Sequence, residues 1–192
     1  MENEEEIVRK AKQGDNQALA KLVDEYKERI YNLGLSMLKH EQDAEDVLQE
    51  TFLTLVEKVQ QFRGDSSIYT WLYRIATNIA LKKLKSKPRK YNHIPIDDPD
   101  YEKIHEEETS QEMEIDFSKI NNKEFREKLN EKLDELPPKY KTIFILRDIH
   151  NLSTRETANI LDITESNTKV RLMRARNYLK EKLEESKIEM TA

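Results

Sequence analysis

Two segments of this 192-residue chain carry basic side chains and no acidic ones. No Asp or Glu occurs in residues 66–96, and none occurs in residues 166–180. The basic residues are Arg74, Lys82, Lys83, Lys85, Lys87, Arg89 and Lys90 in the first segment, and Lys169, Arg171, Arg174, Arg176 and Lys180 in the second. Lys and Arg grouped in this way bind phosphates, so a nucleic acid is a candidate ligand despite the formal net charge of -5.

An acidic and amide cluster precedes the first basic segment, at helical spacing: Glu41, Glu45, Asp46, Gln49 and Glu50. The helix dipole favours acids in a first turn, which is the ordinary structural explanation. A metal site that adds His40 is the alternative, but no helical pairing of histidines accompanies it. The chain has no cysteine, which excludes disulfides, thiolate zinc sites and a cysteine nucleophile. We therefore expect no enzyme activity, metal or cofactor.

Aromatic residues join the first basic segment to a break in the helical pattern at residues 62–67. In the helix that follows, Ile68, Trp71, Leu72, Ile75 and Ile79 make the expected buried stripe, with Tyr69 and Tyr73 on its flanks. Unpaired bases stack on aromatic rings while Lys and Arg follow the phosphates, so this arrangement suits single-stranded nucleic acid. A purely structural role for the aromatics is the alternative.

The second basic segment follows a turn between two predicted helices. Ser153 and Glu156 form a capping box before the first helix. The turn lies at residues 162–164, and the basic helix begins near Thr164. Two helices joined by a tight turn, the second of them basic, are typical of a DNA-binding helix-turn-helix. A bare structural bundle is the alternative.

The composition favours helices throughout, since only three glycines and five prolines occur. A helix over residues 4–13 is expected to stop at Gly14, and Asp15 caps the next helix. Gly34 lies inside that helix, where it marks either a close helix contact or an ordinary tolerated glycine. Further caps are expected at Asp43 and at Ser66 or Ser67. The expected fold class is all-α.

Two small helical domains are predicted, because the apolar periodicity is lost in the middle of the chain. We place them at residues 1–88 and 123–186, joined by an acidic flexible linker at 89–122 and followed by a tail at 187–192. Within the linker, residues 97–116 hold ten acids against the single base Lys103. The N-terminus is acidic, and no run of about 18 apolar residues occurs. We therefore expect no membrane insertion and a cytoplasmic location.

Taken in order, these stretches resemble the bacterial extracytoplasmic-function (ECF, group IV) sigma factors. The matching residues are 43–52 (DAEDVLQETF), 62–66 (FRGDS), 70–78 (TWLYRIATN), 136–148 (LPPKYKTIFILRD) and 171–176 (RLMRAR). The resemblance implies a two-domain dissociable subunit that binds core RNA polymerase and promoter DNA. A stand-alone helix-turn-helix regulator is the alternative hypothesis, and an anti-sigma factor is a further candidate partner.

The resemblance also implies roles for individual residues. Glu45, Asp46, Gln49 and Glu50 would dock on the β′ clamp helices of core polymerase, and residues 138–148 would contact the β flap. The −10 DNA would be held by Phe62, Arg63, Gly64, Asp65, Ser66, Tyr69, Tyr73, Arg74, Asn78 and Lys82. The −35 DNA would be read by Ser166, Asn167, Lys169, Val170 and Arg171, with Arg174 and Arg176 nearer the phosphates.

Three positions depart from the family pattern. Asp162 stands where the turn usually has glycine, but Asp tolerates left-handed backbone better than most residues, so the turn is expected to form. Thr157 and Thr168 stand where aliphatic residues usually pack. If buried, each hydroxyl needs a partner such as a backbone carbonyl one turn back, and we expect a softer C-terminal domain.

Overall fold

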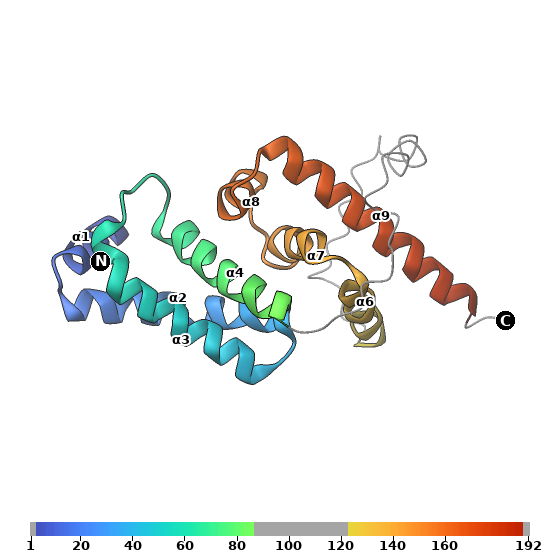
Figure 1. The fold of residues 1–192 in the computed structure, drawn as a ribbon, viewed down its shortest axis with the longest axis horizontal. Coiled ribbons are helices and arrows are strands. Elements are labelled where there is room, and N and C mark those ends of the chain that lie inside the picture. The colour runs from blue at the N-terminus through green and yellow to red at the C-terminus, as the bar shows by residue number, and fades with distance from the viewer. Residues whose placement is uncertain (1–2, 87–122, 190–192) are drawn as a thin grey trace. The chain divides into compact units, whose positions relative to one another are not determined.

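The structure, a computed structural model, describes residues 3–86 and 123–189 of the chain. These residues form helices and no strand, which confirms the all-α prediction (Figure 1). The elements are α1 Glu4–Lys12, α2 Asn16–Leu38, α3 Glu41–Lys58, η1 Val59–Gln61, α4 Ile68–Ser86, α6 Lys123–Glu135, α7 Pro138–Phe144, η4 Ile145–Ile149, α8 Thr154–Leu161 and α9 Glu165–Glu189.

The chain divides into two compact units. Of the described residues, the first unit contains 3–86 together with Asn159–Asp162, and the second contains the others. The predicted linker at 89–122 lies outside the described residues. The predicted tail at 187–192 begins inside α9, which is helical as far as Glu189.

In the first unit, α2, α3 and α4 pack against one another and α1 packs on α2. The core between them contains Leu22, Ile30, Leu33, Met37, Val47, Leu55 and Leu72. The expected start of α2 is confirmed, since Gly14 has a φ of 87° and the Asp15 side chain accepts hydrogen bonds from the backbone N–H groups of Gln17 and Ala18. A left-handed glycine followed by a capping Asp ends one helix and starts the next.

Two further caps were predicted, with different outcomes. Ser67 caps α4 as expected, because its hydroxyl accepts a 3.1 Å hydrogen bond from the backbone N–H of Thr70. The prediction that Asp43 caps α3 is wrong. His40 is the N-cap, and its Nδ1 accepts from the backbone N–H of Asp43 at 3.4 Å, so Asp43 lies in the first turn.

Gly34 marks a close contact between α2 and α3. A Cβ atom at this position would lie 3.1 Å from the Cα of Ala44, so the backbones of the two helices approach closely here. Both residues are buried. Of the two interpretations left open by the sequence, the close helix contact is therefore the one that the structure supports.

Replacing Gly34 with Val is expected to destabilise the first unit by about 1–3 kcal/mol, because the branched side chain overpacks the α2–α3 contact. The measurement is urea unfolding followed by Trp71 fluorescence, since Trp71 lies in this unit. The control is Ala20→Val on the exposed side of α2, which changes helix propensity without a clash. Equal losses in the two variants would contradict the packing explanation.

In the second unit, α6 and α7 pack against α9. Its core includes Leu133, Leu136, Ile143, Phe144, Leu146, Ala158, Leu172, Ala175 and Leu179. Three polar links tie its elements together. The buried Lys141 places its Nζ 2.7 Å from Asp134, Tyr178 donates to Glu135 at 2.9 Å, and Arg176 binds Asp148. These contacts join α6 to α7, α6 to α9 and η4 to α9. Removing one partner of a buried ion pair would leave an uncompensated charge, which is strongly destabilising.

The turn between α8 and α9 forms as the sequence predicted. Ser153 and Glu156 make the capping box, in which the Ser153 backbone N–H donates to the Glu156 carboxylate at 2.8 Å and the Ser153 hydroxyl accepts from the Glu156 N–H. Asp162 has a φ of 55°, in the left-handed region. The Thr164 hydroxyl accepts from the backbone N–H of Asn167, which caps α9. Local hydrogen bonds thus define the starts of the two helices, α8 and α9, that the turn connects.

Thr157 and Thr168 are both fully buried, but only one hydroxyl finds the expected partner. The Thr168 hydroxyl donates to the Thr164 carbonyl, one turn back, at 3.0 Å. The Thr157 hydroxyl has no hydrogen-bond partner among the described residues. A buried polar group without a partner destabilises the folded state, whereas a bonded one is roughly neutral or favourable.

Replacing Thr157 with Val is therefore expected to stabilise the second unit by about 1–3 kcal/mol. The matched control is Thr168→Val, which removes a made hydrogen bond and is expected to be neutral or destabilising. Amide hydrogen exchange in α8 and α9 measures the change, because the single tryptophan lies in the other unit. A gain at Thr168 as large as that at Thr157 would contradict this account.

Candidate functional site

The first half of α3 presents the predicted acidic face to solvent. Glu45, Gln49 and Glu50 are exposed and Asp46 is half-exposed, while Ala44, Val47 and Thr51 point into the core. The periodicity of α3 explains this division, because residues three and four apart share a face. The structure therefore brings all four predicted docking residues onto one accessible surface.

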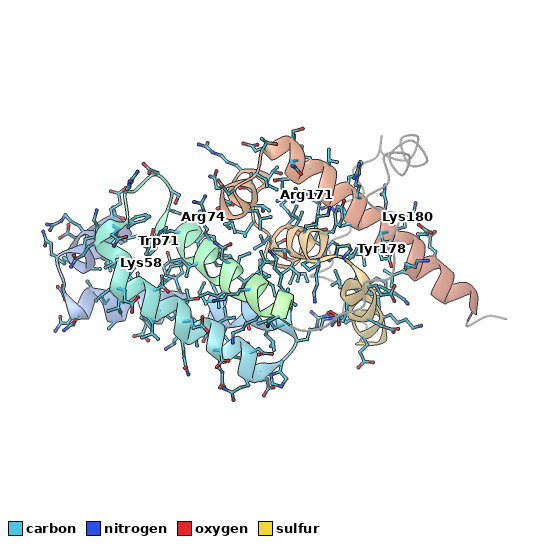
Figure 2. The ribbon with its side chains drawn as sticks, viewed as in Figure 1. Lys58, Trp71, Arg74, Arg171, Tyr178 and Lys180 are labelled. Carbon is cyan, nitrogen blue, oxygen red and sulfur yellow. The ribbon has the colours of Figure 1, made fainter. Side chains whose placement is uncertain are left out.

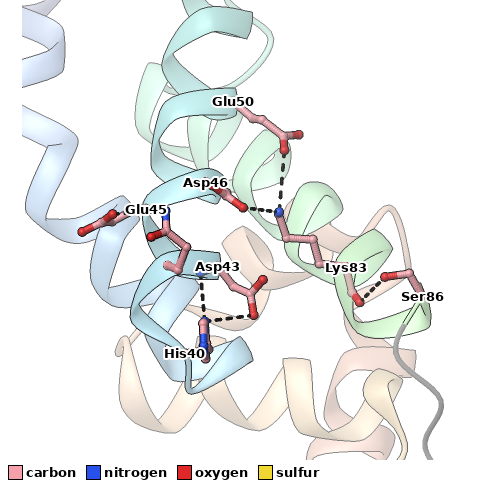
Figure 3. Close-up of polar contacts among 8 residues, drawn as sticks. His40, Asp43, Glu45, Asp46, Glu50, Lys83 and Ser86 are labelled. Atoms are coloured by element: carbon pink, nitrogen blue, oxygen red, sulfur yellow. Dashed lines mark hydrogen bonds and ion pairs between the residues drawn. The ribbon is translucent and has the colours of Figure 1, made fainter.

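Lys83 of α4 reaches across to this acidic surface. Its Nζ lies 2.8 Å from the Asp46 carboxylate and 3.9 Å from the Glu50 carboxylate (Figure 3). The hydrogen bond from Lys83 holds the pKa of Asp46 below its usual range, and the same bond raises the pKa of Lys83. Both groups are therefore charged at neutral pH. The sequence showed the two charges but not that they meet.

The alternative of a metal site around His40 gains no support. His40 contacts Asp43, with 3.5 Å between Nδ1 and the carboxylate (Figure 3). No group of three or more His, Asp or Glu side chains within the described ranges is arranged to hold a metal ion.

In the second half of α3, exposed apolar side chains lie on the same side of the helix as the acidic face. Leu53 is 63% exposed and Val56 is 55% exposed, and these are the large apolar residues most open to solvent in the described part of the chain. They follow Gln49 by four and seven residues, which places them on the same side of the helix. These two residues were not predicted from the sequence, because only the acids of this helix were considered. The available signal was their spacing, which continues the Gln49 side of the helix with apolar residues.

The loop before α4 exposes the middle of the predicted −10 segment and buries its start. Arg63, Gly64 and Asp65 are exposed and Ser66 is half-exposed. Phe62 is buried, with its ring 5.4 Å from that of Trp71 between centroids. Its backbone carbonyl accepts a 2.8 Å hydrogen bond from Lys12 of α1. Phe62 therefore anchors the loop, and the residues after it face solvent.

The tyrosines of α4 differ in exposure. Tyr69 is half-exposed, with its ring beside those of Tyr73 and Tyr26 and the Arg29 guanidinium 5.7 Å from its centroid. Tyr73 is only 1% exposed, so the prediction that it lies on a flank is wrong. Trp71, expected in the buried stripe, is half-buried. Because α4 packs against both α2 and α3, its buried surface is wider than a single stripe and includes Tyr73.

Three predicted DNA-binding residues form a row along α4. Arg74, Asn78 and Lys82 are all exposed and are spaced by four residues, so they share one face of the helix (Figure 2 labels Arg74). This face differs from the one that carries Lys83. The geometry suits contacts to a nucleic-acid backbone that follows the helix.

The start of α9 carries the second predicted DNA surface. Ser166, Asn167 and Lys169 are exposed, and Val170 and Arg171 are half-exposed in the same turns (Figure 2 labels Arg171). Arg174 is also half-exposed. Arg176 behaves differently: it binds the buried carboxylate of Asp148 through two hydrogen bonds of 2.6 and 2.8 Å. Arg176 therefore holds α9 to η4, and the accessible basic surface is centred on the first turns of α9.

None of the described helices combines the length and the apolar character needed to cross a membrane.

Two family models match the chain. Residues 22–90 match the model of Sigma-70 region 2, and residues 126–179 match that of Sigma-70, region 4. The first match covers the helices that carry the acidic face and the −10 segment. The second covers the helix-turn-helix.

Curated proteins resemble the chain over nearly its whole length. The ECF RNA polymerase sigma factor SigW of Bacillus subtilis is 32% identical, over 92% of this chain and 94% of that protein. The RNA polymerase sigma-H factor of Pseudomonas aeruginosa is 28% identical, over 95% of both chains. The ECF RNA polymerase sigma-E factor of Haemophilus influenzae is 29% identical, over 93% of this chain and 94% of that protein.

Solved structures share the fold. CnrH, solved in complex with the cytosolic domain of CnrY, aligns with a TM-score of 0.67 at 20% identity, over 93% of this chain and 95% of that one. The sigma factor RpoE of Bartonella quintana, solved in complex with the anti-sigma factor NepR, aligns with a TM-score of 0.58 at 18% identity, over 86% of this chain and 96% of that one.

Proposed function

Since this chain belongs to the ECF RNA polymerase sigma factors, within the sigma-70 family, we propose that its two units divide promoter recognition between them. The sigma region 2 match at residues 22–90 favours a sigma subunit over a stand-alone regulator, which needs only the helix-turn-helix. The division of labour rests on one observation: the first unit exposes an acidic face on α3 and a basic row on α4, while the second exposes a basic start of α9.

The acidic face of α3 is proposed to dock on the β′ clamp helices of core polymerase. Glu45, Asp46, Gln49 and Glu50 supply charge and hydrogen bonds, and Leu53 and Val56 extend the surface with apolar area. Protein interfaces combine an apolar centre with a polar rim, which this helix offers along its length. The charged half steers association and the apolar half is buried on docking.

The loop and α4 are proposed to hold the unpaired −10 strand. Arg63, Gly64, Asp65 and Ser66 offer exposed groups to bases, and Tyr69 offers part of a ring. Arg74, Asn78 and Lys82 would follow the phosphates. We assign Phe62 and Tyr73 to packing beneath this surface, since both are buried.

Base capture needs no ATP in this proposal. Flipping a base out of the duplex costs a few kcal/mol, and a base stacked on an aromatic ring regains about 1–3 kcal/mol. Binding energy alone can therefore open the duplex, and we propose that the subunit is not an enzyme.

The first turns of α9 are proposed to enter the major groove of the −35 element. Ser166, Asn167, Lys169, Val170 and Arg171 would lie nearest the base edges, with Arg174 at the phosphates. We assign Arg176 to the ion pair with Asp148 rather than to DNA. The segment 138–148 would contact the β flap through its exposed side, where Lys139 lies.

Regulation by an anti-sigma factor is proposed by analogy. One similar structure, that of Bartonella quintana RpoE, is a complex with an anti-sigma factor. Because the polymerase and its promoters are cytoplasmic, we place the action of this subunit there.

Transcription in vitro tests the proposal. The purified chain is mixed with bacterial core polymerase and a library of promoters, and the expected result is specific transcripts that core enzyme alone does not produce. Binding of the chain by itself to duplex sites, without any core-dependent transcript, would support the stand-alone regulator instead.

A further inference from the structure

We propose that Lys83 occupies, in the free subunit, the position on α3 that a cationic side chain of core polymerase takes when the two proteins bind. The inference rests on the proposed docking role of the α3 acids and adds to it a competing internal cation. Lys83 would thereby connect the polymerase-binding surface with the DNA-binding end of α4.

The contact geometry is that of a cation already bound at the docking surface. The Lys83 ammonium lies 2.8 Å from Asp46 and 3.9 Å from Glu50, between two successive turns of α3 (Figure 3). The Lys83 side chain is 23% exposed, whereas those of Asp46 and Glu50 are 39% and 55% exposed. Both carboxylates can therefore be reached from solvent by a cation that competes with Lys83.

Displacement of Lys83 is energetically accessible. An ion pair at the protein surface, between partly exposed groups such as these, contributes little net free energy, so this contact does not lock α3 to α4. A guanidinium presents a planar fork that binds carboxylates through two parallel hydrogen bonds, which an ammonium cannot do. We therefore infer that the group that replaces Lys83 is an arginine of the polymerase.

The displaced ammonium would serve DNA binding. Lys83 stands between the exposed residues Lys82 and Lys85 at the basic end of α4, and of these three it is the one paired with α3 acids. Once released, its long side chain can turn from the α3 side of α4 toward the neighbouring face that carries Lys82, and there it adds one positive charge near the phosphates of the −10 strand. Docking on core polymerase would then strengthen DNA binding, and DNA would strengthen docking by the same factor.

The variant Lys83→Met tests both parts of this proposal, the competition at the docking surface and the link to DNA binding. It removes the charge and keeps an unbranched side chain. We expect its affinity for core polymerase to rise about two- to fivefold, since the internal competitor is gone. We expect the holoenzyme to bind forked −10 DNA less tightly, with the slope of log K against log salt smaller by about 0.7–0.9. A residue with a merely structural role would not produce these opposite changes.

Two control variants sharpen the result. Lys83→Arg keeps the charge and should restore the salt slope, and because its guanidinium binds the α3 carboxylates at least as well as an ammonium, core affinity should be equal to or lower than that of the unaltered chain. Lys85→Met removes an exposed charge from the same end of α4, so it should reduce the salt slope and leave core affinity unchanged. Circular dichroism melting of each variant checks that the fold is kept.

The outcomes separate this inference from the proposed function. If charge reversal at Asp46 and Glu50 weakens docking but Lys83→Met leaves docking unchanged or weaker, the docking surface stands and the role of Lys83 is overturned. If charge reversal has no effect on docking, the proposed surface itself is overturned and the inference falls with it. Tighter docking together with an unchanged salt slope would overturn the link to DNA.

Discussion

Charge reversal at Asp46 and Glu50 is expected to reduce affinity for core polymerase on the order of 100-fold or more. The double variant Asp46→Lys/Glu50→Lys converts two attractive contacts into repulsive ones at the proposed docking surface. Like charges placed across an interface cost several kcal/mol, and each 1.4 kcal/mol is tenfold in affinity. Titration of labelled subunit with core enzyme measures the effect. The loss should shrink at high salt, because both carboxylates are accessible to solvent.

The matched control is Glu5→Lys/Asp24→Lys, which makes the same change in net charge on α1 and α2, at exposed positions. It should bind core polymerase nearly as the unaltered chain does. Equal losses in the two double variants would mean that overall charge, rather than this surface, governs docking. If the added lysines beside Lys83 disturb the fold, the double variant Asp46→Asn/Glu50→Gln tests the same surface by removing the two negative charges without adding positive ones.

Loss of −35 discrimination is the expected result of replacing Lys169 and Arg171 with Ala. Removing one base contact typically costs about 1–3 kcal/mol and relaxes specificity at that position. For a promoter chosen by the unaltered holoenzyme, the ratio of transcription from the intact and the scrambled −35 element should fall about 10- to 100-fold. Core binding should not change, because both residues lie outside the two surfaces proposed to contact core polymerase.

Lys180→Ala/Lys182→Ala is the matched control. It removes two positive charges farther along the same helix, where Lys180 lies well away from Arg171 (Figure 2). It should weaken binding to all DNA slightly and leave the −35 ratio intact. If the control lowers the ratio as much as the test variant does, the start of α9 does not read the bases.

The local features of this protein followed from its sequence. Asp15, Ser67 and the Ser153–Glu156 capping box were predicted correctly, as was the left-handed backbone at Asp162. Each depends on residues within a few positions of one another, since a cap or a turn is completed by its own neighbours. The exception was Asp43, where His40 lies three residues earlier and begins the helix.

The contacts between helices could not be predicted in the same way. A 3.6-residue period gives the buried side of a helix that has one neighbour, but α4 has two, and this is why Tyr73 is buried. The role of Arg176 was likewise hidden, because its partner Asp148 lies 28 residues away in η4. For Gly34, the sequence allowed either a close helix contact or a tolerated glycine. The short distance to Ala44 of α3 in the structure supports the close contact.

The sequence by itself determined the helices, the two acid-free basic segments and the acidic face of α3, because charge and periodicity are properties of the chain order. Only the tertiary structure decided which charges meet. In the structure Lys83 pairs with Asp46 and Glu50, and Arg176 pairs with Asp148. Leu53 and Val56 are exposed to solvent. Pairing between residues 28 or more positions apart depends on how helices pack. Helix packing is set by side-chain shape over whole faces rather than by local spacing.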